Sequence, residues 1–180
     1  MPLGLKKGTV ALEPHRVEWE VSAQKLIEKL KCVLKCDIID AQHIGSTSIK
    51  TICAKPIVDI VVGVSSLEKI MRHNDTLAEN GVFFRREDHP GQLLYVCGDL
   101  KSNIHTHYIH AVLWGQENWN NYLNMRDYLN THEDKAKEYS MLKQCLAEMY
   151  PDDRIAYTVG KSELIASILE CAEKWRKQCS

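Results

Sequence analysis

The sequence lacks the features that mark membrane, secreted and nucleic-acid-binding proteins. Its longest apolar stretches are too short to cross a bilayer. Its opening segment, MPLGLKKGTVALEP, has no apolar core of the kind found in signal peptides. It contains no run of Lys and Arg and its formal net charge is −1, which argues against a nucleic-acid partner or an anionic membrane surface. We therefore expect a cytoplasmic protein with no membrane partner.

The chain also lacks a metal-binding or disulfide pattern among its cysteines. The seven Cys are scattered and form no CxxC pair, so neither a zinc module nor a disulfide framework is indicated. Internal repeats, low-complexity segments and long linkers are absent as well. A chain of 180 residues, 44% hydrophobic and 26% charged, suffices for one soluble domain with a core. We expect a single domain over residues 1–180, with an α/β half at about 14–114 and a helical half at about 115–180.

The most informative stretch is QHIGSTSIKTICAKPIVDIVVGV, from Gln42 to Val64. Its second part is nearly continuous β-branched sequence and predicts a strand covered on both faces. Asp59 lies in the middle of that strand, and a buried carboxylate needs a hydrogen bond, a paired charge or a cation. Asp59 is therefore either a structural residue, pairing for example with Lys55, or a ligand for a divalent metal.

The first part of this stretch contains the turn Gly45-Ser46-Thr47-Ser48. Glycine adopts backbone angles that other residues avoid, and the N–H groups of such a turn at a helix start bind anions such as phosphate. An ordinary Ser/Thr-rich turn that caps a short helix is the alternative. A Gly-Ser turn followed by a short helix and an Asp-bearing strand is the layout of a nucleotidyltransferase active site.

Hydrophobic periodicity predicts an α+β fold. A first helix over 14–34, with Val17, Val21 and Leu30 on its inner stripe, precedes a strand over 37–43. A second helix runs from Ser65 or Ser66 to Gly81. Three strands, at 82–87, 93–97 and 105–114, follow with short turns between them, which predicts an antiparallel meander and hence a mixed sheet. Further helices are expected at 117–130, at 134–149, and from 157–161 to about 177.

Three histidines in the last predicted strand form a second candidate site. His105 and His107 share one face of a strand, whereas Tyr108 and His110 share the other. The three imidazoles cannot meet one zinc ion unless the strand bends. His110 is either a surface histidine or a polar group in the Asp59 pocket, as metal ligand or general acid/base.

The segment HIGSTSIKTICAKPIVDI closely resembles the signature of the GrpB family, which reads roughly HIGSTS, a short variable piece, then AKPIIDI. Arg126-Asp127-Tyr128-Leu129 resembles the family's FRDYL piece, with Met125 in place of Phe. Tyr139 with Lys143, and Tyr157 with Lys161, match two Tyr–Lys patterns of the family, so the resemblance covers about residues 14–170.

GrpB proteins resemble the polymerase-β-like nucleotidyltransferases. That resemblance implies a mixed sheet with helices on one side and a helical C-terminal part. The superfamily pattern is a Gly-Ser turn, a strand with Asp-x-Asp or Asp-x-Glu, and a third carboxylate on a later strand. Val61 stands here where the second acid is expected, so the two-metal set is incomplete.

The resemblance implies transfer of a nucleotidyl group from a nucleoside triphosphate to a small acceptor, assisted by Mg²⁺ or Mn²⁺. The alternatives are a non-catalytic nucleotide- or coenzyme-binding module, or a divergent phosphate-dependent ligase or hydrolase. The candidate residues are Asp59 and His110 for catalysis, Asp59 for the metal, and His43, Gly45, Ser46, Thr47, Ser48, Lys55, Arg126, Lys143, Tyr157 and Lys161 for the nucleotide or phosphate. Each of these residues also has a structural interpretation when taken singly. His43 is equally a structural histidine. Arg126 is otherwise an ion-pair partner of Asp127, and Lys143 or Lys161 is otherwise a solvated surface lysine.

Overall fold

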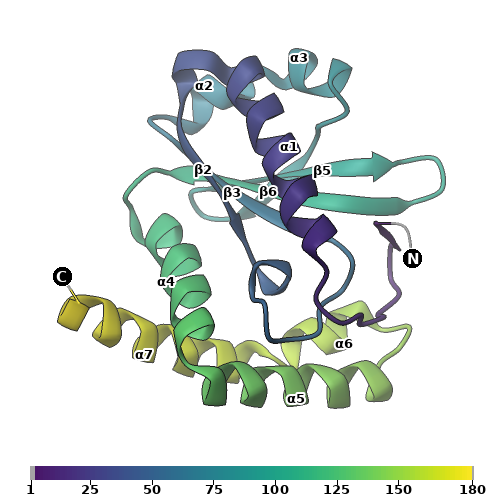
Figure 1. The fold of residues 1–180 in the computed structure, drawn as a ribbon. Coiled ribbons are helices and arrows are strands. Elements are labelled where there is room, and N and C mark those ends of the chain that lie inside the picture. The colour runs from purple at the N-terminus through teal and green to yellow at the C-terminus, as the bar shows by residue number, and fades with distance from the viewer. Residues whose placement is uncertain (1–2, 180) are drawn as a thin grey trace.

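The structure, a computed structural model that describes residues 3–179, is organised around a six-stranded mixed sheet (Figure 1). The strands are ordered β2-β3-β6-β5-β4, and the short β1 pairs with β6. β3 and β6 are parallel, and the other pairs are antiparallel. The strands are β1 (Leu5–Lys6), β2 (Ile38–Ile44), β3 (Val58–Val64), β4 (Phe83–His89), β5 (Gln92–Asp99) and β6 (Ile104–Leu113). The predicted α+β class and mixed sheet are confirmed.

Helices cover both faces of the sheet. The helices are α1 (Val17–Leu34), α2 (Leu67–Met71), α3 (Asn74–Glu79), α4 (Glu117–Thr131), α5 (Glu133–Met149), α6 (Arg154–Val159) and α7 (Ser162–Cys179). The first three pack on one face, and α4 packs on the other. The last three form a layer next to the loop that joins β2 to β3 (Figure 1). No helix among residues 3–179 is long and apolar enough to span a bilayer.

β3 is an interior strand of the sheet and is covered on both faces, as its sequence predicts. Val58, Ile60 and Val62 pack against α1, whereas Val61 packs against Trp119 of α4. Because side chains alternate along a strand, Asp59 faces the same side as Val61. Asp59 therefore points away from α1, towards the C-terminal helices.

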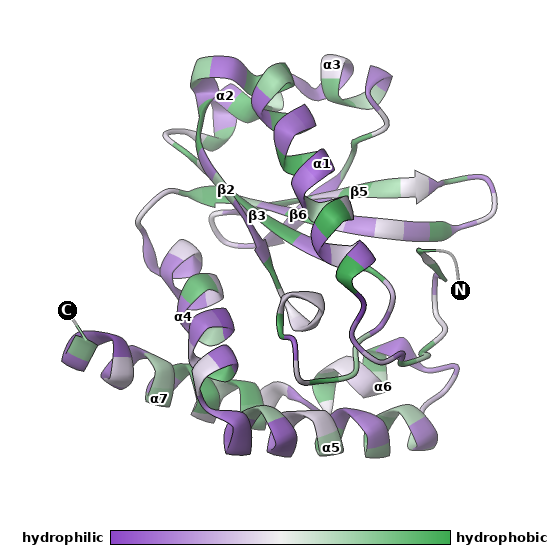
Figure 2. Ribbon diagram, in the orientation of Figure 1, coloured by the Kyte–Doolittle hydropathy of each residue, from purple (hydrophilic) through white to green (hydrophobic). Residues whose placement is uncertain are grey.

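The layer of C-terminal helices is joined to the loop between β2 and β3. Ile49 and Ile52 of that loop share a buried cluster with Leu129 of α4, Tyr139 of α5 and Ile168 of α7. The helices supply these residues from hydrophobic stripes, visible as alternating colours along each ribbon in Figure 2. Each Å² of apolar surface buried in this cluster contributes about 25 cal/mol of stability. The loop is therefore fixed against the helices that face Asp59.

Three details of the helices differ from the predictions. Val17 and Val21 are 66% and 49% exposed rather than on the inner stripe of α1. The inner stripe begins instead at Trp19 and continues through Ala23 and Leu30, a phase that apolar spacing alone does not distinguish. The predicted second helix is divided into α2 and α3, and a separate short helix, α6, precedes α7.

We predict that Gly63→Ala destabilises the fold. An added Cβ at Gly63 would lie 2.6 Å from Trp114 Cδ1 and 2.9 Å from Trp119 Cζ3, so the two rings would have to move. Overpacking of this kind costs about 1–3 kcal/mol of unfolding free energy, measurable by urea denaturation. Ser65→Ala, an exposed position just after the same strand, should change it by less than about 0.5 kcal/mol. Equal stability of the two variants would contradict the prediction.

Candidate functional site

The turn after β2 lies directly against the carboxylate of Asp59. Gly45 has φ 70°, and a Cβ added there would lie 2.5 Å from Asp59 Oδ2. Glycine is therefore required both by its backbone angle and by the close approach. The following residues, Ser46–Ser48, form one 3₁₀ turn, in which Ser48 Oγ donates to the Gly45 carbonyl at 2.7 Å.

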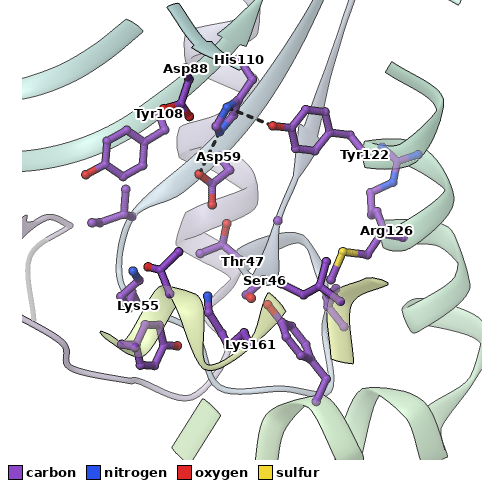
Figure 3. A pocket seen from close by; sticks show the side chains of 18 of the residues that line it. Ser46, Thr47, Lys55, Asp59, Asp88, Tyr108, His110, Tyr122, Arg126 and Lys161 are labelled. Atoms are coloured by element: carbon purple, nitrogen blue, oxygen red, sulfur yellow. Dashed lines mark hydrogen bonds and ion pairs between the residues drawn. The ribbon is translucent and has the colours of Figure 1, made fainter. Parts of the chain in front are cut away.

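Asp59 and His110 are brought together by the parallel pairing of β3 and β6. Asp59 is paired with Tyr108, two residues before His110 on the same face of β6. Their side chains are 29% and 15% exposed, and His110 Nε2 lies 3.5 Å from Asp59 Oδ1. The two side chains lie in the centre of the site (Figure 3), so the predicted meeting of Asp59 and His110 is observed.

Three basic side chains line the pocket from outside the sheet. Lys55 precedes β3, Arg154 begins α6, and Lys161 lies between α6 and α7. The Nζ atoms of Lys55 and Lys161 lie 4.9 and 4.5 Å from the centre of the Tyr157 ring, within the range of cation–π attraction. Arg154 Nη1 donates to the hydroxyl of Tyr108 at 2.6 Å. The C-terminal helices thus supply most of the positive charge opposite Asp59.

Burial makes this positive charge costly. Burial, followed by the positive charges of Arg154 and Lys161, lowers the pKa of Lys55 to about 7. Burial also lowers the pKa of Lys161 to about 8, although the negative charge of Asp59 opposes the shift. Among residues 3–179, Lys55, Arg154 and Lys161 form no ion pair. An anionic ligand would relieve this cost by pairing with them.

The pocket formed by these groups is large enough for a small molecule. Its volume is about 380 Å³, within the usual range for small-molecule sites. Aromatic and apolar side chains complete its wall, namely Tyr108, Tyr122, Tyr139, Tyr157, Ile49, Ile57, Met125 and Ile165. A ligand that combines anionic groups with a flat apolar part matches this lining.

Most of the predicted site residues converge on this pocket. Those that line it are Gly45, Ser46, Thr47, Lys55, Asp59, His110, Arg126, Tyr157 and Lys161. The guanidinium of Arg126 is already hydrogen-bonded, since its Nη1 donates to Gln42 Oε1 at 3.1 Å and to the His43 carbonyl at 3.2 Å. Its Nε donates to Asp127 at 2.7 Å, so Arg126 chiefly fixes α4 against β2.

His43, Ser48 and Lys143 are not among the residues that line the pocket. His43 lies on the α1 side of the sheet, paired with the buried Ile60. Its Nε2 is 2.9 Å from Thr47 Oγ1, and burial lowers its pKa to about 4. Lys143 is 1% exposed, and its Nζ donates to the carbonyl of Cys53. His43 and Lys143 therefore act as structural residues. His43 supports the turn through Thr47, and Lys143 supports the loop through Cys53.

The three histidines of β6 have separate surroundings. His105 Nδ1 lies 2.8 Å from the hydroxyl of Tyr108, and His107 Nε2 lies 3.0 Å from Ser22 Oγ on α1. His110 alone of the three lines the pocket. No group of three or more His, Cys, Asp or Glu in residues 3–179 is placed to hold a metal ion.

Sequence reasoning missed Arg154, Gln92 and Tyr122. Arg154 had a local signal, because Asp153 caps α6 by accepting from the backbone N–H groups of Ile155 and Ala156 at 3.0 Å. A helix starting at this cap places residues 154, 157 and 161 on one face. Gln92 and Tyr122 had no such signal, because they come from β5 and α4 and meet only after the sheet and α4 pack.

We predict that the ligand-free protein gains stability between pH 7 and 8.5. Burial lowers the pKa of Lys143 from 10.5 to about 7, so in this interval the unfolded chain binds more protons than the folded chain. The free energy of unfolding then rises by up to about 1.4 kcal/mol per pH unit for this one group. Above about pH 9 the rise should become less steep, because burial raises the pKa of the Cys97 thiol from 9.0 to about 12 and the unfolded chain then loses this proton before the folded chain does.

Urea denaturation of wild type and Lys143→Met across this pH range checks the assignment. Methionine fills a similar volume without a titrating group, so the variant should show a shallower rise. Identical pH dependence in the two proteins would mean that Lys143 does not titrate with the assigned pKa.

Comparison with known proteins places the chain in a family. The model of the family described as GrpB protein matches residues 9–171. The Glutamate-rich protein GrpB of Alkalihalophilus pseudofirmus is 38% identical over 170 residues, which are 93% of this chain and 98% of that protein. UPF0157 protein YqkA of Bacillus subtilis is 34% identical over 95% of this chain, but the match spans only 49% of YqkA.

Solved structures support the same placement and add the fold. The crystal structure of conserved protein GrpB from Enterococcus faecalis matches with a TM-score of 0.85 and 27% identity, over 92% of this chain and 99% of that chain. The Cid1 poly(U) polymerase with MgGTP bound matches with a TM-score of 0.51 and 14% identity, over 76% and 44% of the two chains. The second match shows a nucleotidyltransferase-like fold and no more. The matches over nearly the whole length, together with the Gly45–Asp59 turn and strand, show that the chain belongs to the GrpB family.

Proposed function

We propose that the pocket binds a nucleoside triphosphate or a related phosphorylated small molecule and transfers its nucleotidyl group to a small acceptor. The observation that carries the proposal is the convergence of Lys55, Arg154 and Lys161, without ion-pair partners among the described residues, on the pocket beside the Gly45 turn. Buried cations favour an anionic partner, and phosphate oxygens accept several charge-assisted hydrogen bonds at once. The backbone of the Gly-Ser turn supplies further donors.

The lining favours a nucleoside over bare phosphate. Tyr122, Tyr139 and Met125 belong to the aromatic and apolar lining of the pocket, and Tyr122 lies on the side away from Lys55 (Figure 3). A base has a flat apolar face that stacks on such side chains, while the phosphates would lie towards the basic residues. The nucleotidyltransferase-like fold supports this arrangement by analogy, since the Cid1 polymerase structure holds MgGTP.

The acidic residues fit one metal ion and not two. Val61, at the position of the expected second acid, is 0% exposed and packs against Trp119. Asp88 also lines the pocket, but its carboxylate accepts from Arg86 Nε at 2.7 Å. Asp59 remains as the carboxylate for a divalent cation, and Mg²⁺ or Mn²⁺ commonly takes one carboxylate with waters and substrate phosphates. Such a cation would neutralise phosphate charge at the reacting end of the ligand.

The residues of this chain would act mainly by positioning and electrostatics. Phosphoryl-type transfers depend on aligned reactants and stabilised oxygen charges more than on covalent chemistry from the protein. Lys55, Lys161 and Arg154 would hold the phosphates that leave, and the turn at Gly45 would hold them close to Asp59. All seven cysteines are free thiols, in keeping with a proposed location in the reducing cytoplasm.

A binding module without turnover is the second candidate. The incomplete acidic set favours it, because two-metal catalysis stabilises both the attacking and the leaving oxygen and one metal cannot do both. In that case the same pocket would recognise a nucleotide or coenzyme and leave it unchanged.

Calorimetric titration tests binding. We predict that at least one nucleoside triphosphate binds the full chain and that Lys161→Gln weakens it by roughly tenfold or more, because a charge-assisted hydrogen bond contributes about 1.5–3 kcal/mol. The matched control is Lys177→Gln, an exposed lysine of α7 paired with Glu173, which should bind as wild type does. If no nucleotide or inorganic triphosphate binds, or if both variants lose affinity equally, the proposal is wrong.

Metal dependence separates the two candidates. We predict that Mg²⁺ or Mn²⁺ strengthens nucleotide binding to wild type and not to Asp59→Asn, which keeps the side-chain shape but loses the charge. Pyrophosphate release in the presence of metal, absent in Asp59→Asn, would indicate nucleotidyl transfer. Tight binding that is unaffected by metal, without pyrophosphate release, would instead indicate an accessory module.

A further inference from the structure

Tyr108 holds the guanidinium of Arg154 at the wall of the pocket. Arg154 Nη1 donates to the Tyr108 hydroxyl at 2.6 Å, and its Cζ lies 5.0 Å from the centre of the Tyr108 ring, within the range of cation–π attraction. Tyr108 is 8% exposed and lies on the Lys55 side of the pocket, opposite Tyr122 (Figure 3). One side chain of the sheet therefore holds this half-buried arginine by two kinds of contact.

His105 orients the hydroxyl of Tyr108. His105 is 4% exposed, and its Nδ1 lies 2.8 Å from that hydroxyl. A guanidinium can only donate, so the Tyr108 oxygen accepts from Arg154 and its single hydrogen is left for His105. Among residues 3–179 no other group forms a hydrogen bond with this hydroxyl. The hydrogen bonds therefore run in one direction, from Arg154 through Tyr108 to Nδ1 of His105.

This direction requires a neutral His105. Burial lowers the pKa of His105, and the positive charges of Arg85, Arg154 and Lys7 lower it further. A neutral imidazole has one nitrogen without a hydrogen, and that nitrogen accepts. An imidazolium would instead donate from both nitrogens and compete with Arg154 for the oxygen of Tyr108. His105, one of the three histidines of β6, thus acts as a hydrogen-bond acceptor.

The remaining donors of Arg154 are available to a ligand. Among residues 3–179 its guanidinium donates no second hydrogen bond and forms no ion pair, and it lines the pocket together with Lys55 and Lys161. A guanidinium presents its donors in a planar fork that matches two oxygens of a phosphate. When that fork is oriented before the ligand arrives, less side-chain freedom is lost on binding.

We infer that Tyr108, oriented by His105, is a positioning residue that presents Arg154 to a phosphate group of the ligand. The inference rests on the proposed function, because it concerns how the same pocket holds phosphate. It also distinguishes the basic residues from one another. The amines of Lys55 and Lys161 lie over the ring of Tyr157, whereas Arg154 is held by a hydrogen bond, which is directional. Arg154 is therefore the basic group whose donors are aimed before phosphate binds.

Calorimetric titration of the full chain with inorganic triphosphate tests the inference. Tyr108→Phe keeps the ring and removes the hydroxyl, so it should weaken triphosphate binding roughly tenfold. Tyr95→Phe is the matched control, because it also removes a buried hydroxyl, one that donates to Asn74 Oδ1 at 2.9 Å. Tyr95 is not among the residues that line the pocket, so this variant should bind triphosphate as wild type does.

Two further comparisons separate positioning from a general loss of structure. When Arg154→Gln is already present, Tyr108→Phe should change triphosphate affinity by less than about twofold, because no guanidinium remains to be oriented. His105→Asn offers an amide oxygen near the position of Nδ1 and should retain the affinity of wild type. His105→Leu removes the acceptor and should weaken binding in the same direction as Tyr108→Phe.

Three results would overturn the inference and leave the proposed function standing. They are unchanged triphosphate affinity in Tyr108→Phe, an equal loss with and without Arg154, and equal affinities of His105→Asn and His105→Leu. The last comparison decides the outcome even if Tyr108→Phe proves too unstable to assay. If wild type binds neither triphosphate nor any nucleotide, the proposed function fails, and this inference fails with it.

Discussion

The site depends on the close approach of the Gly45 backbone to the carboxylate of Asp59. No side chain fits between them, because a Cβ on residue 45 would lie 2.5 Å from Asp59 Oδ2. This contact fixes the distance between the turn and β3, and it holds the carboxylate on the side of the pocket formed by the sheet. The packing of Ile49 and Ile52 against the C-terminal helices fixes the rest of the loop, so the turn cannot move away from Asp59 without disturbing that cluster.

The pocket combines a carboxylate from the sheet with basic groups from the loop before β3 and from the C-terminal helices. The sheet supplies Asp59, while Arg154 and Lys161 come from α6 and the junction that follows it. Burial lowers the pKa of Lys161 to about 8, so the unliganded protein retains an unfavourable concentration of buried cations. An anionic ligand that bridges the two halves would relieve this cost and join the helices to the sheet. Ligand binding and stability are therefore expected to be coupled in this fold.

Much of the architecture could be predicted from local pattern. The β-branched run around Asp59 correctly indicated a strand covered on both faces, and the short turns between the strands predicted at 82–87, 93–97 and 105–114 correctly indicated a meander. The phase of α1 was wrong at Val17 and Val21, since a helix with apolar residues on more than one side has several plausible inner stripes. Short helices such as α2 and α3 have too few turns for periodicity to show where one ends and the next begins.

Local sequence was enough to specify the chemistry of the turn and strand, because Gly45 and Asp59 belong to one short segment whose residue types restrict the backbone and bury a carboxylate. It also placed His110 on the same face as Tyr108 through the alternation of a strand. The groups that surround them depend on tertiary packing, because Gln92 and Tyr122 lie on separate elements and no local rule relates their positions. His43 lies outside the pocket for the same reason. The packing of distant elements, and not the residues of one strand, determines which helices cover each face of the sheet.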